Sequence, residues 1–384
     1  MKRNLSIACA ILCCTTTLYA QNDLKQKFNP ISTAIISQTI APDARAAGMG
    51  DIGAATEPDA ASQAWNPAKY PFAISRAGLS VNYTPWLRQI VNDIDLAYLS
   101  GFIRLGDYQA ISGSIRYFSL GSVSAAEGAY TIKPYEFAID AAYSRMLSEK
   151  FSASVALRYL YSDLNSGHNE TTGGSAFAAD ISTYYNNYLM MGQRECQIAI
   201  GVNISNIGSK VNYGTEESYF LPTNLRLGLA YTIPMNEFNR LMFTAEANKL
   251  LVPTPPIQGE SESAEEYRQR LQTEYMDQSP IAGIFKSFGD APGGFKEELE
   301  EIQWNLGAEY IYNDKFSIRG GYHHESASKG NRKYFTIGAG FKMNVFQVDA
   351  GYVIATTASN PLDQTLRVSL AFDLDGLRDL FGRR

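Results

Sequence analysis

The 384-residue sequence has little cysteine. Three of its four cysteines, Cys9, Cys13 and Cys14, lie within the first 20 residues. The remaining one, Cys196, has no partner for an internal disulfide, so packing and hydrogen bonds must hold the fold together. A buried packing role suits this residue better than a reactive thiol, because a small apolar environment is where unpaired cysteines are usually found.

The residues of common active sites are also scarce. There are only three histidines, at positions 168, 323 and 324. Adjacent strand residues point to opposite faces, so His323 and His324 make a poor ligand pair for a metal. The chain has no nucleophile elbow and no phosphate-binding loop. We therefore predict no catalytic residues, no cofactor, no metal site and no enzymatic activity. The net charge of −6 argues against nucleic acid as a partner.

The mature chain lacks any apolar run near 18 residues, so no helical membrane span is predicted. Its only leader-like stretch is the beginning, where Lys2 and Arg3 precede an apolar core at residues 5–14. This pattern predicts a signal peptide over residues 1–20, cleaved between Ala20 and Gln21. If an exported protein without a helical span is inserted in a membrane, it must use a structure other than a transmembrane helix.

Aromatic residues are abundant, with 24 tyrosines and 19 phenylalanines, and many segments alternate apolar and polar residues. Such alternation is what lipid on one side and a lumen on the other require. We predict an all-β membrane protein, a 14-stranded antiparallel outer-membrane β-barrel; a soluble β-sandwich is the alternative fold. The predicted strands begin near Ala77, Asp95, Gln109, Glu136, Phe151, Ser175, Cys196, Asn224, Arg240, Ile302, Phe316, Lys333, Phe346 and Gln364.

The connections support the barrel. Those after even-numbered strands are short and those after odd-numbered strands are long, except for one long even connection at residues 187–195. Bacterial barrels have short periplasmic turns and long extracellular loops. An even strand number then predicts a multi-pass barrel with both termini in the periplasm.

Charged residues recur at the polar positions of the strands. Five are basic and five acidic, so they can pair inside one lumen at a lower cost than isolated charges. We favour a lattice of ion pairs over an ion-selective pore lining. The residues are Arg116, Arg158, Arg226, Arg319, Arg367, Asp140, Asp180, Glu246, Glu309 and Asp349.

Two segments are not strand-like. Residues 48–70 are rich in Gly and Ala and contain Trp65, Asn66 and Pro67, which predicts a luminal plug anchored by these three residues; a periplasmic cap is the alternative. Residues 249–301 form the longest loop, with helix-start signals at Ser263 and Ser279. Its apolar stripe either packs on the barrel rim or docks a partner. The stripe consists of Ile281, Ile284, Phe285 and Phe288.

The Asn66-Pro67-Ala68 motif after an Ala-rich run and before 14 strands resembles the FadL family of outer-membrane barrels, which have an N-terminal hatch. Several longer stretches more specifically resemble the PorV (LptO) family, the FadL-like barrels of the Bacteroidetes type IX secretion system. These stretches are "APDARAAGMGDIGAATEPDAASQAWNPAKYPFA", "NYTPWLRQIVNDIDLAYLSGF", "QAISGSIRYFSLG", "EFAIDAAYSRMLSEKFSASVALRY", "NKLLVPTPP" and "GIFKSFGDAPGGFKEELEEI".

The resemblance implies an outer-membrane shuttle. Such proteins bind the C-terminal signal domain of secreted cargo as it leaves the SprA (Sov) translocon. They deliver it to the PorU sortase, which acts with PorQ and PorZ to attach the cargo to lipopolysaccharide. The alternative is a FadL-type channel for hydrophobic small molecules, and an outer-membrane deacylase ranks last because no Ser/His/Asp arrangement supports it.

The resemblance does not identify the cargo-binding residues. We expect them in the first long loop, at Pro85, Trp86 and Leu87, and in the helical loop, at Ile281, Ile284, Phe285 and Phe288; they fit an aromatic girdle at the membrane interface equally well. The predicted organisation is a signal peptide (1–20), an N-terminal segment with the plug (21–75), a barrel (76–373, with the insert 249–301) and a periplasmic tail (374–384).

Overall fold

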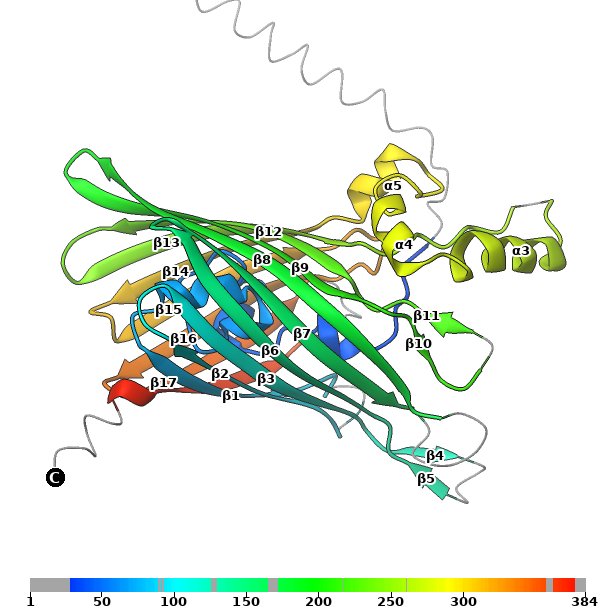
Figure 1. Ribbon diagram of the computed structural model, residues 1–384, viewed down its shortest axis with the longest axis horizontal. Helices are drawn as coiled ribbons and strands as arrows, with labels where there is room; N and C mark the ends of the chain where they lie inside the picture. The colour runs from blue at the N-terminus through cyan, green and yellow to red at the C-terminus, as the bar shows by residue number, and fades with distance from the viewer. Residues whose placement is uncertain are drawn as a thin grey trace, which may run out of the picture.

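The computed structural model describes residues 28–88, 91, 93–125, 130–164, 172–215, 217–259, 261–356 and 362–376. The predicted signal peptide with its cleavage site, His168 and the tail beyond residue 376 lie outside these ranges. Within them, 14 antiparallel strands close into one barrel (Figure 1). The predicted fold class is confirmed, including the N-terminal plug and the helical loop, and a β-sandwich is excluded because the sheet closes on itself.

Every predicted strand is present, and each begins within two residues of its expected start. The period-2 alternation located them well because lipid and lumen impose it along the whole wall. The strands are β1 (Ala77–Pro85), β2 (Ile94–Arg104), β3 (Gln109–Leu120), β6 (Tyr135–Ser148), β7 (Phe151–Asp163), β8 (Gly174–Met191), β9 (Arg194–Gly208), β12 (Asn224–Pro234), β13 (Asn239–Leu250), β14 (Gln303–Tyr312), β15 (Phe316–His324), β16 (Lys333–Met343), β17 (Phe346–Ala355) and β18 (Leu366–Asp373).

One predicted connection is wrong. The segment 187–195 is not a long loop, because β8 and β9 continue pairing through it until Met191 lies opposite Arg194. Gly192 then turns the chain with φ 66°, a conformation that glycine adopts without strain. All the even-numbered connections are therefore tight turns. The long connections carry two small hairpins, β4 (Val123–Ala125) with β5 (Tyr130–Ile132) and β10 (Val211–Asn212) with β11 (Ser218–Tyr219).

Helices occur in the N-terminal segment and in the longest loop. The N-terminal segment has η1 (Ile36–Thr39), α2 (Ala44–Ala47), η2 (Ser62–Ala64) and η3 (Pro67–Phe72). The loop has α3 (Ala264–Leu271), the π-helical turn η5 (Gln272–Met276), α4 (Pro280–Lys286) and α5 (Phe295–Glu300). Among the described residues, no helix has the length and apolarity needed to cross a membrane.

The prediction that both termini are periplasmic concerns residues that lie outside the described ranges. Both ends of the barrel, Ala77 and Asp373, lie at the short-turn end, as an even strand number requires. The described N-terminal end lies at the opposite rim, where the Asn29 amide donates to the Ser328 carbonyl in the β15–β16 loop. The reason is that residues 28–76 run lengthwise through the lumen before β1 begins, a path that strand parity does not report. Figure 1 shows this start beside α4, far from the C-terminal end.

Candidate functional site

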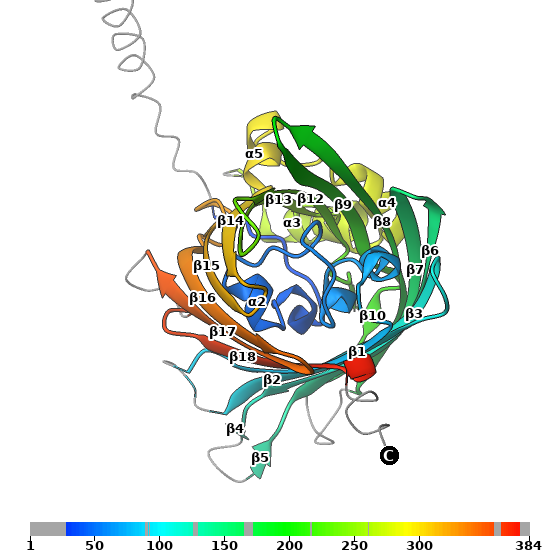
Figure 2. The ribbon, with the colours of Figure 1, turned by 90° about the vertical axis from the view of Figure 1, so that its left-hand side faces the viewer.

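The lumen is filled by the N-terminal segment. Residues 28–43, which we call the strap, descend from the long-loop end. Residues 44–73, which we call the plug, follow it and include α2, η2 and η3. Viewed from the short-turn end, the plug lies inside the ring of strands (Figure 2). Most of its apolar residues are buried, and Met49, Ile52 and Tyr70 are buried completely.

The Asn66-Pro67 motif fastens the plug to the wall. The Asn66 amide donates to the carbonyls of Ala54 in the plug and Thr183 on β8, both at 2.9 Å. Its side-chain oxygen accepts from the Ala68 amide at 3.0 Å and so caps η3. The Pro67 carbonyl accepts from the Ser144 hydroxyl on β6. One short motif therefore ties the plug's own turn to two strands of the wall.

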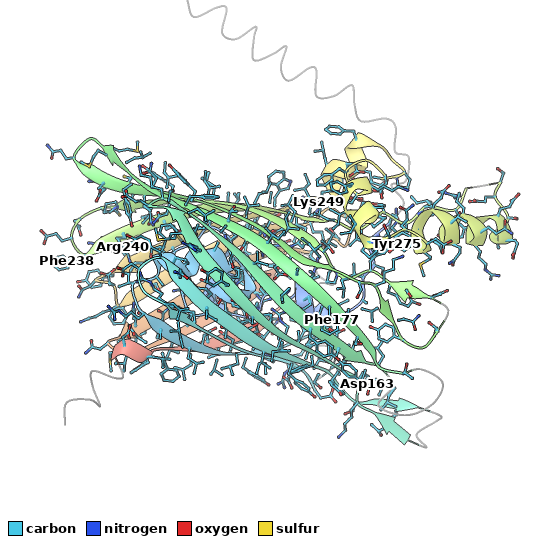
Figure 3. All side chains as sticks on the ribbon, in the orientation of Figure 1. Asp163, Phe177, Phe238, Arg240, Lys249 and Tyr275 are labelled. Atoms are coloured by element: carbon cyan, nitrogen blue, oxygen red, sulfur yellow. The ribbon has the colours of Figure 1, made fainter. Side chains whose placement is uncertain are left out.

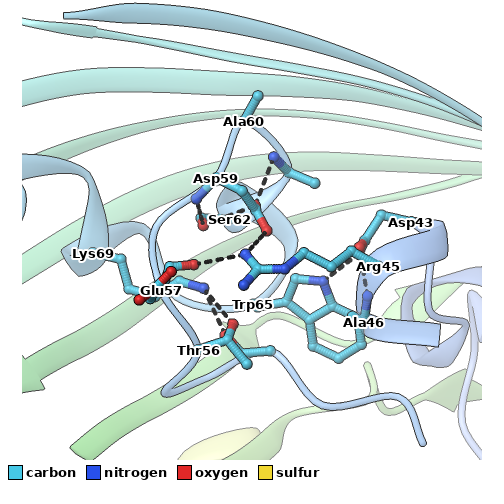
Figure 4. A network of polar contacts seen from close by, with 12 residues as sticks. Asp43, Arg45, Ala46, Thr56, Glu57, Asp59, Ala60, Ser62, Trp65 and Lys69 are labelled. Atoms are coloured by element: carbon cyan, nitrogen blue, oxygen red, sulfur yellow. Dashed lines mark hydrogen bonds and ion pairs between the residues drawn. The ribbon is translucent and has the colours of Figure 1, made fainter. Parts of the chain in front are cut away.

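A charged cluster organises the interior of the plug (Figure 4). The Trp65 indole donates to Asp43 at 2.5 Å, which places this ring in the centre of the plug. Arg45 pairs with Asp59 at 2.8 Å and reaches the wall at Glu309, 2.9 Å away. The Lys69 ammonium donates to the Gly53 carbonyl at 2.7 Å. These buried charges have partners, which is the condition for keeping them in a low-dielectric interior.

The predicted luminal lattice is present except at Arg116, which donates to the Ile40 carbonyl of the strap at 3.0 Å, and the plug takes part in the lattice. Arg158 pairs with Asp180, and Arg319 pairs with Glu309 and Asp349, as expected for wall residues. Arg367 instead pairs with Asp51 of the plug at 2.6 Å. The sequence could not reveal that wall residues pair with the plug, because Arg45 and Asp51 lie in a segment without strand periodicity.

Close approach of the plug depends on glycines in the wall, which the sequence analysis did not single out. A Cβ on Gly201 of β9 would lie 1.9 Å from the Ala54 carbonyl oxygen. A Cβ on Gly321 of β15 would lie 2.1 Å from the Met49 carbonyl carbon. Neither position tolerates a side chain unless the plug backbone moves. Small residues on both partners therefore allow the plug to fit.

The helical loop at the other end is anchored by buried ion pairs. Lys249 at the end of β13 binds Glu298 of α5 at 3.1 Å and Glu301, which caps the end of α5, at 2.5 Å. Lys329, in the β15–β16 loop, binds Glu301 at 3.0 Å. The side-chain amide of Asn29 in the strap donates to the Pro255 carbonyl. Figure 3 shows Lys249 and Tyr275 at this end and Phe238 and Arg240 at the other. The loop, the strap and the barrel rim are thus joined into one rigid unit.

The predicted cargo-binding residues fall into two groups. Pro85, Trp86 and Leu87 are half-buried, and Trp86 folds inward, where it packs against two apolar clusters in the barrel mouth. Of the α4 stripe, Ile284 is half-buried. The other three face outward: Ile281, Phe285 and Phe288, at 57%, 75% and 55% exposure. The structure does not bring the first loop and the outer face of α4 into one surface.

The next helix of the loop also exposes apolar residues. Phe295 and Leu299 of α5 are also exposed. Gly283, on the opposite side of α4, lies so close to Pro253 and Phe220 that a Cβ would be 2.9 Å from the proline ring. The outward apolar face is therefore fixed in orientation. A fixed, exposed aromatic face is a candidate interaction surface.

The closed barrel with a plugged lumen defines the class: an outer-membrane barrel of the FadL type. The family model "Type IX secretion system protein PorV" matches residues 22–257, more than half of the chain, so the chain belongs to the PorV family. Like FadL-type barrels, this family consists of secretion or channel proteins of the outer membrane. Membership of this secretion-system family confirms the predictions of an outer-membrane location and of no enzymatic activity.

Solved structures show the same fold at low identity. The TodX deltaS2S3 mutant, a monoaromatic hydrocarbon channel, is 11% identical, with 86% of this chain and 98% of that chain covered and a TM-score of 0.50. The Pseudomonas putida toluene transporter TodX is 10% identical over 90% and 99% of the chains, with a TM-score of 0.47. A Pseudomonas aeruginosa FadL homologue is 10% identical over the same shares, with a TM-score of 0.43. No curated protein sequence matches this chain.

Proposed function

We propose that this PorV-family barrel is the cargo shuttle of a type IX secretion system. It binds the C-terminal signal domain of secreted proteins as they leave the SprA (Sov) translocon. It then delivers them to the PorU sortase with PorQ and PorZ, which attach them to lipopolysaccharide. Family membership supports a role in type IX secretion, and the shuttle step is our proposal.

The observation that carries the proposal is the outward face of α4. Ile281 and Phe285 of α4 and Phe288, two residues beyond its end, are exposed at the long-loop end, where Gly283 seats the helix against Pro253 and Phe220. Rigid aromatic and aliphatic anchors bind protein partners with little loss of side-chain freedom. We propose that these three residues contact cargo with the half-buried Ile284 beside them, and that Pro85, Trp86 and Leu87 form a separate contact in the first long loop.

The alternative, a channel for hydrophobic molecules, has less support in the lumen. The plug packs against the wall through paired charges and close backbone contacts. Among the described strands, each of the 14 pairs with both neighbours. An open apolar passage would require the plug to leave many of these partners.

The test is affinity capture of the tagged protein from detergent-solubilised outer membrane, followed by mass spectrometry of proteins and lipids. The variant is Phe285→Ser. Its control is Phe238→Ser, which removes an exposed phenylalanine at the short-turn end (56% exposed). Several secreted proteins with one shared C-terminal domain should be recovered with the wild type and the control and depleted at least tenfold in Phe285→Ser. Recovery of apolar small molecules without cargo would contradict the shuttle and favour the channel.

A further inference from the structure

The hairpin between β8 and β9 continues past the wall at the short-turn end. The last residue of β8 that pairs with β7 is Tyr185, opposite Phe151, whereas β8 and β9 pair until Met191 lies opposite Arg194. On the other side, β12 last pairs with β9 at Gln197. At about 3.3 Å per residue, β8 therefore extends about 20 Å along its own direction beyond its last contact with β7. We call residues 187–196 the projecting hairpin.

One edge of the projecting hairpin has unpaired backbone groups. In an antiparallel ladder, the backbone groups of successive residues point alternately to the two neighbouring strands. The Asn186 amide donates to the Lys150 carbonyl at 2.8 Å, so the even-numbered residues of this segment point toward the β7 side. The amides and carbonyls of Tyr188 and Met190 point to that same side. They have no backbone partner there among the described residues.

This edge lacks the features that usually protect exposed strands. Lysine, proline or a β-bulge normally keeps an edge strand from pairing with another chain. Residues 187–191 are Asn-Tyr-Leu-Met-Met, without charge or proline. The one register shift of the β8–β9 ladder lies far away, between Ala179 and Ile181. The charged residues of the hairpin, Arg194 and Glu195, are on β9. The edge of β8 is therefore open to an added strand.

Both faces of the projecting hairpin are apolar. Leu189 and Met191, at 41% and 57% exposure, continue the outward face of β8. Tyr188 and Met190, at 56% and 67% exposure, continue the face that points into the lumen along the wall. Lipid would contact only the outward face, so it does not account for the other pair. An occupant must cover apolar side chains on both faces.

The projecting hairpin also lies beyond the membrane boundary of the wall. The alternation of their strands places Phe151, Tyr185 and Tyr231 on the outward face at this end. Such outward aromatic residues form belts at the membrane–water interface of barrels. The apolar residues 188–191 follow Tyr185 toward the short turn and thus reach the periplasmic side. Large exposed apolar patches in water mark interaction sites.

We propose that the projecting hairpin binds a short extended segment of a periplasmic protein, which adds to the edge of β8 as a further strand. The open backbone groups select an extended chain, because only such a chain presents donors and acceptors at the spacing of a strand. The two apolar faces select a segment with several consecutive apolar residues, since its side chains alternate between the faces. Methionine side chains adapt to the shape of such a partner.

This inference goes beyond the proposed shuttle function, because the hairpin and the outer face of α4 lie at opposite ends of the barrel. The test places the photo-crosslinking residue p-benzoylphenylalanine at position 188 of the full chain in intact cells. The control places it at Tyr108, an exposed tyrosine of the β2–β3 turn at the same end, at 63% exposure. Position 188 should give adducts with a periplasmic protein, joined at a run of consecutive apolar residues, and position 108 should not.

Two variants show whether the backbone edge is used. Met190→Pro removes an amide that points away from β9, so it leaves the β8–β9 ladder intact and should reduce cross-linking from position 188 at least tenfold. Met190→Ala keeps the amide and should reduce it less than threefold. Both substitutions lie outside the barrel wall, and denaturant unfolding in detergent should match the wild type. Cargo capture should also be unchanged in Met190→Pro, so the two proposals fail separately.

A binding measurement completes the test. The probe is a synthetic peptide that spans the cross-linked segment, and its control is the same peptide with a central proline. The first peptide should bind the purified protein in detergent and slow hydrogen exchange at Tyr188 and Met190, and the proline peptide should not. Equal adducts at positions 188 and 108, adducts only with lipid or with a second copy of this chain, or cross-linking that survives Met190→Pro would each overturn the proposal.

Discussion

The plug–wall contact and the outer face of α4 are built in opposite ways. In the first, Arg45, Glu309 and Asn66 are buried, charged or polar, and fully engaged with partners. In the second, Phe285 and Ile281 are apolar and exposed, although α4 itself is rigidly seated. A soluble surface rarely keeps such a face uncovered without an interaction to serve. The difference separates residues that stabilise the closed lumen from residues that are free to bind, and the following experiments test that separation.

The largest loss of stability should come from a substitution in the barrel wall. Glu309 accepts from both Arg45 of the plug and Arg319 of the neighbouring strand. Glu309→Gln leaves two buried guanidinium groups short of a counter-charge, which should reduce the free energy of unfolding by about 3–5 kcal/mol. Denaturant unfolding in detergent measures it. The control Asp314→Asn breaks a pair whose carboxylate is 77% exposed and should leave stability unchanged. Equal losses of stability in the two variants would contradict the idea that the buried plug–wall pairs stabilise the barrel more than exposed pairs do.

The second-largest loss of stability should come from a substitution of Asn66, which anchors the plug. Asn66→Ala removes a helix cap and two hydrogen bonds to buried carbonyls. We expect a loss of about 1–3 kcal/mol, with faster hydrogen exchange across the plug. Asn212→Ala is a matched control, because Asn212 makes the same kind of side-chain contacts within an exposed loop hairpin. A plug whose exchange is unchanged in Asn66→Ala would show that the wall glycines alone hold it.

A smaller and local effect is expected at the base of the helical loop. Lys249→Met removes the cation between Glu298 and Glu301. Amide exchange in α5 should accelerate about tenfold, which corresponds to about 1.4 kcal/mol of local stability. Global unfolding should not change, because the barrel ladder is untouched. Lys286→Met, on the exposed side of α4, is the control. A global loss of stability would mean that the loop and the barrel unfold together.

The smallest effect concerns pH. Burial raises the pKa of Asp290, in the helical loop, from 3.8 to about 6, and nearby Glu298 and Glu301 add to the shift. A raised folded-state pKa means that this carboxyl favours the folded loop below about pH 4, and that this contribution is lost as the pH rises to about 6. Asp290→Asn keeps the acceptor for the Thr254 amide and should abolish this dependence.

The measurement is amide exchange of the loop at pH 4.5 and pH 7, corrected for the intrinsic rates. The wild-type loop should be better protected at the lower pH, by less than about tenfold, because Asp290 is partly exposed to water. Asp277→Asn, at an exposed aspartate of the same loop, should behave as the wild type. A wild-type loop that is better protected at pH 7 would contradict the assignment.

Much of the barrel could be predicted because each strand obeys the same simple requirement. In β7, Val155 and Leu157 face lipid while Ser154 and Arg158 face the lumen, and that alternation is visible in the sequence. The α-helices of the long loop were also located, since Ser263 and Ser279 cap them as expected. The turn at Gly192 was missed because the ladder there continues into residues without a clear apolar face.

The interior of the lumen was predicted only in outline. The charges on the wall were identified, but the partner of Arg367 and one of the two partners of Glu309 lie in the aperiodic N-terminal segment. The path of the strap depends on the three-dimensional position of that segment. Trp86 was expected on the rim for its size and chemistry, and its inward fold follows from packing with residues distant in sequence. Such long-range contacts leave no local signal.

The lengthwise path of the strap and plug has a consequence for assembly. Residues 28–76 are made before any strand, yet they end up enclosed by all of them, and the ring closes only when β1 meets β18. Inserting this segment into a finished barrel would move Arg45, Lys69 and other charged groups past the barrel wall. Pairing β1 with β18 around a segment that is already in place avoids that barrier. We therefore expect this segment to be in place before the strands close around it.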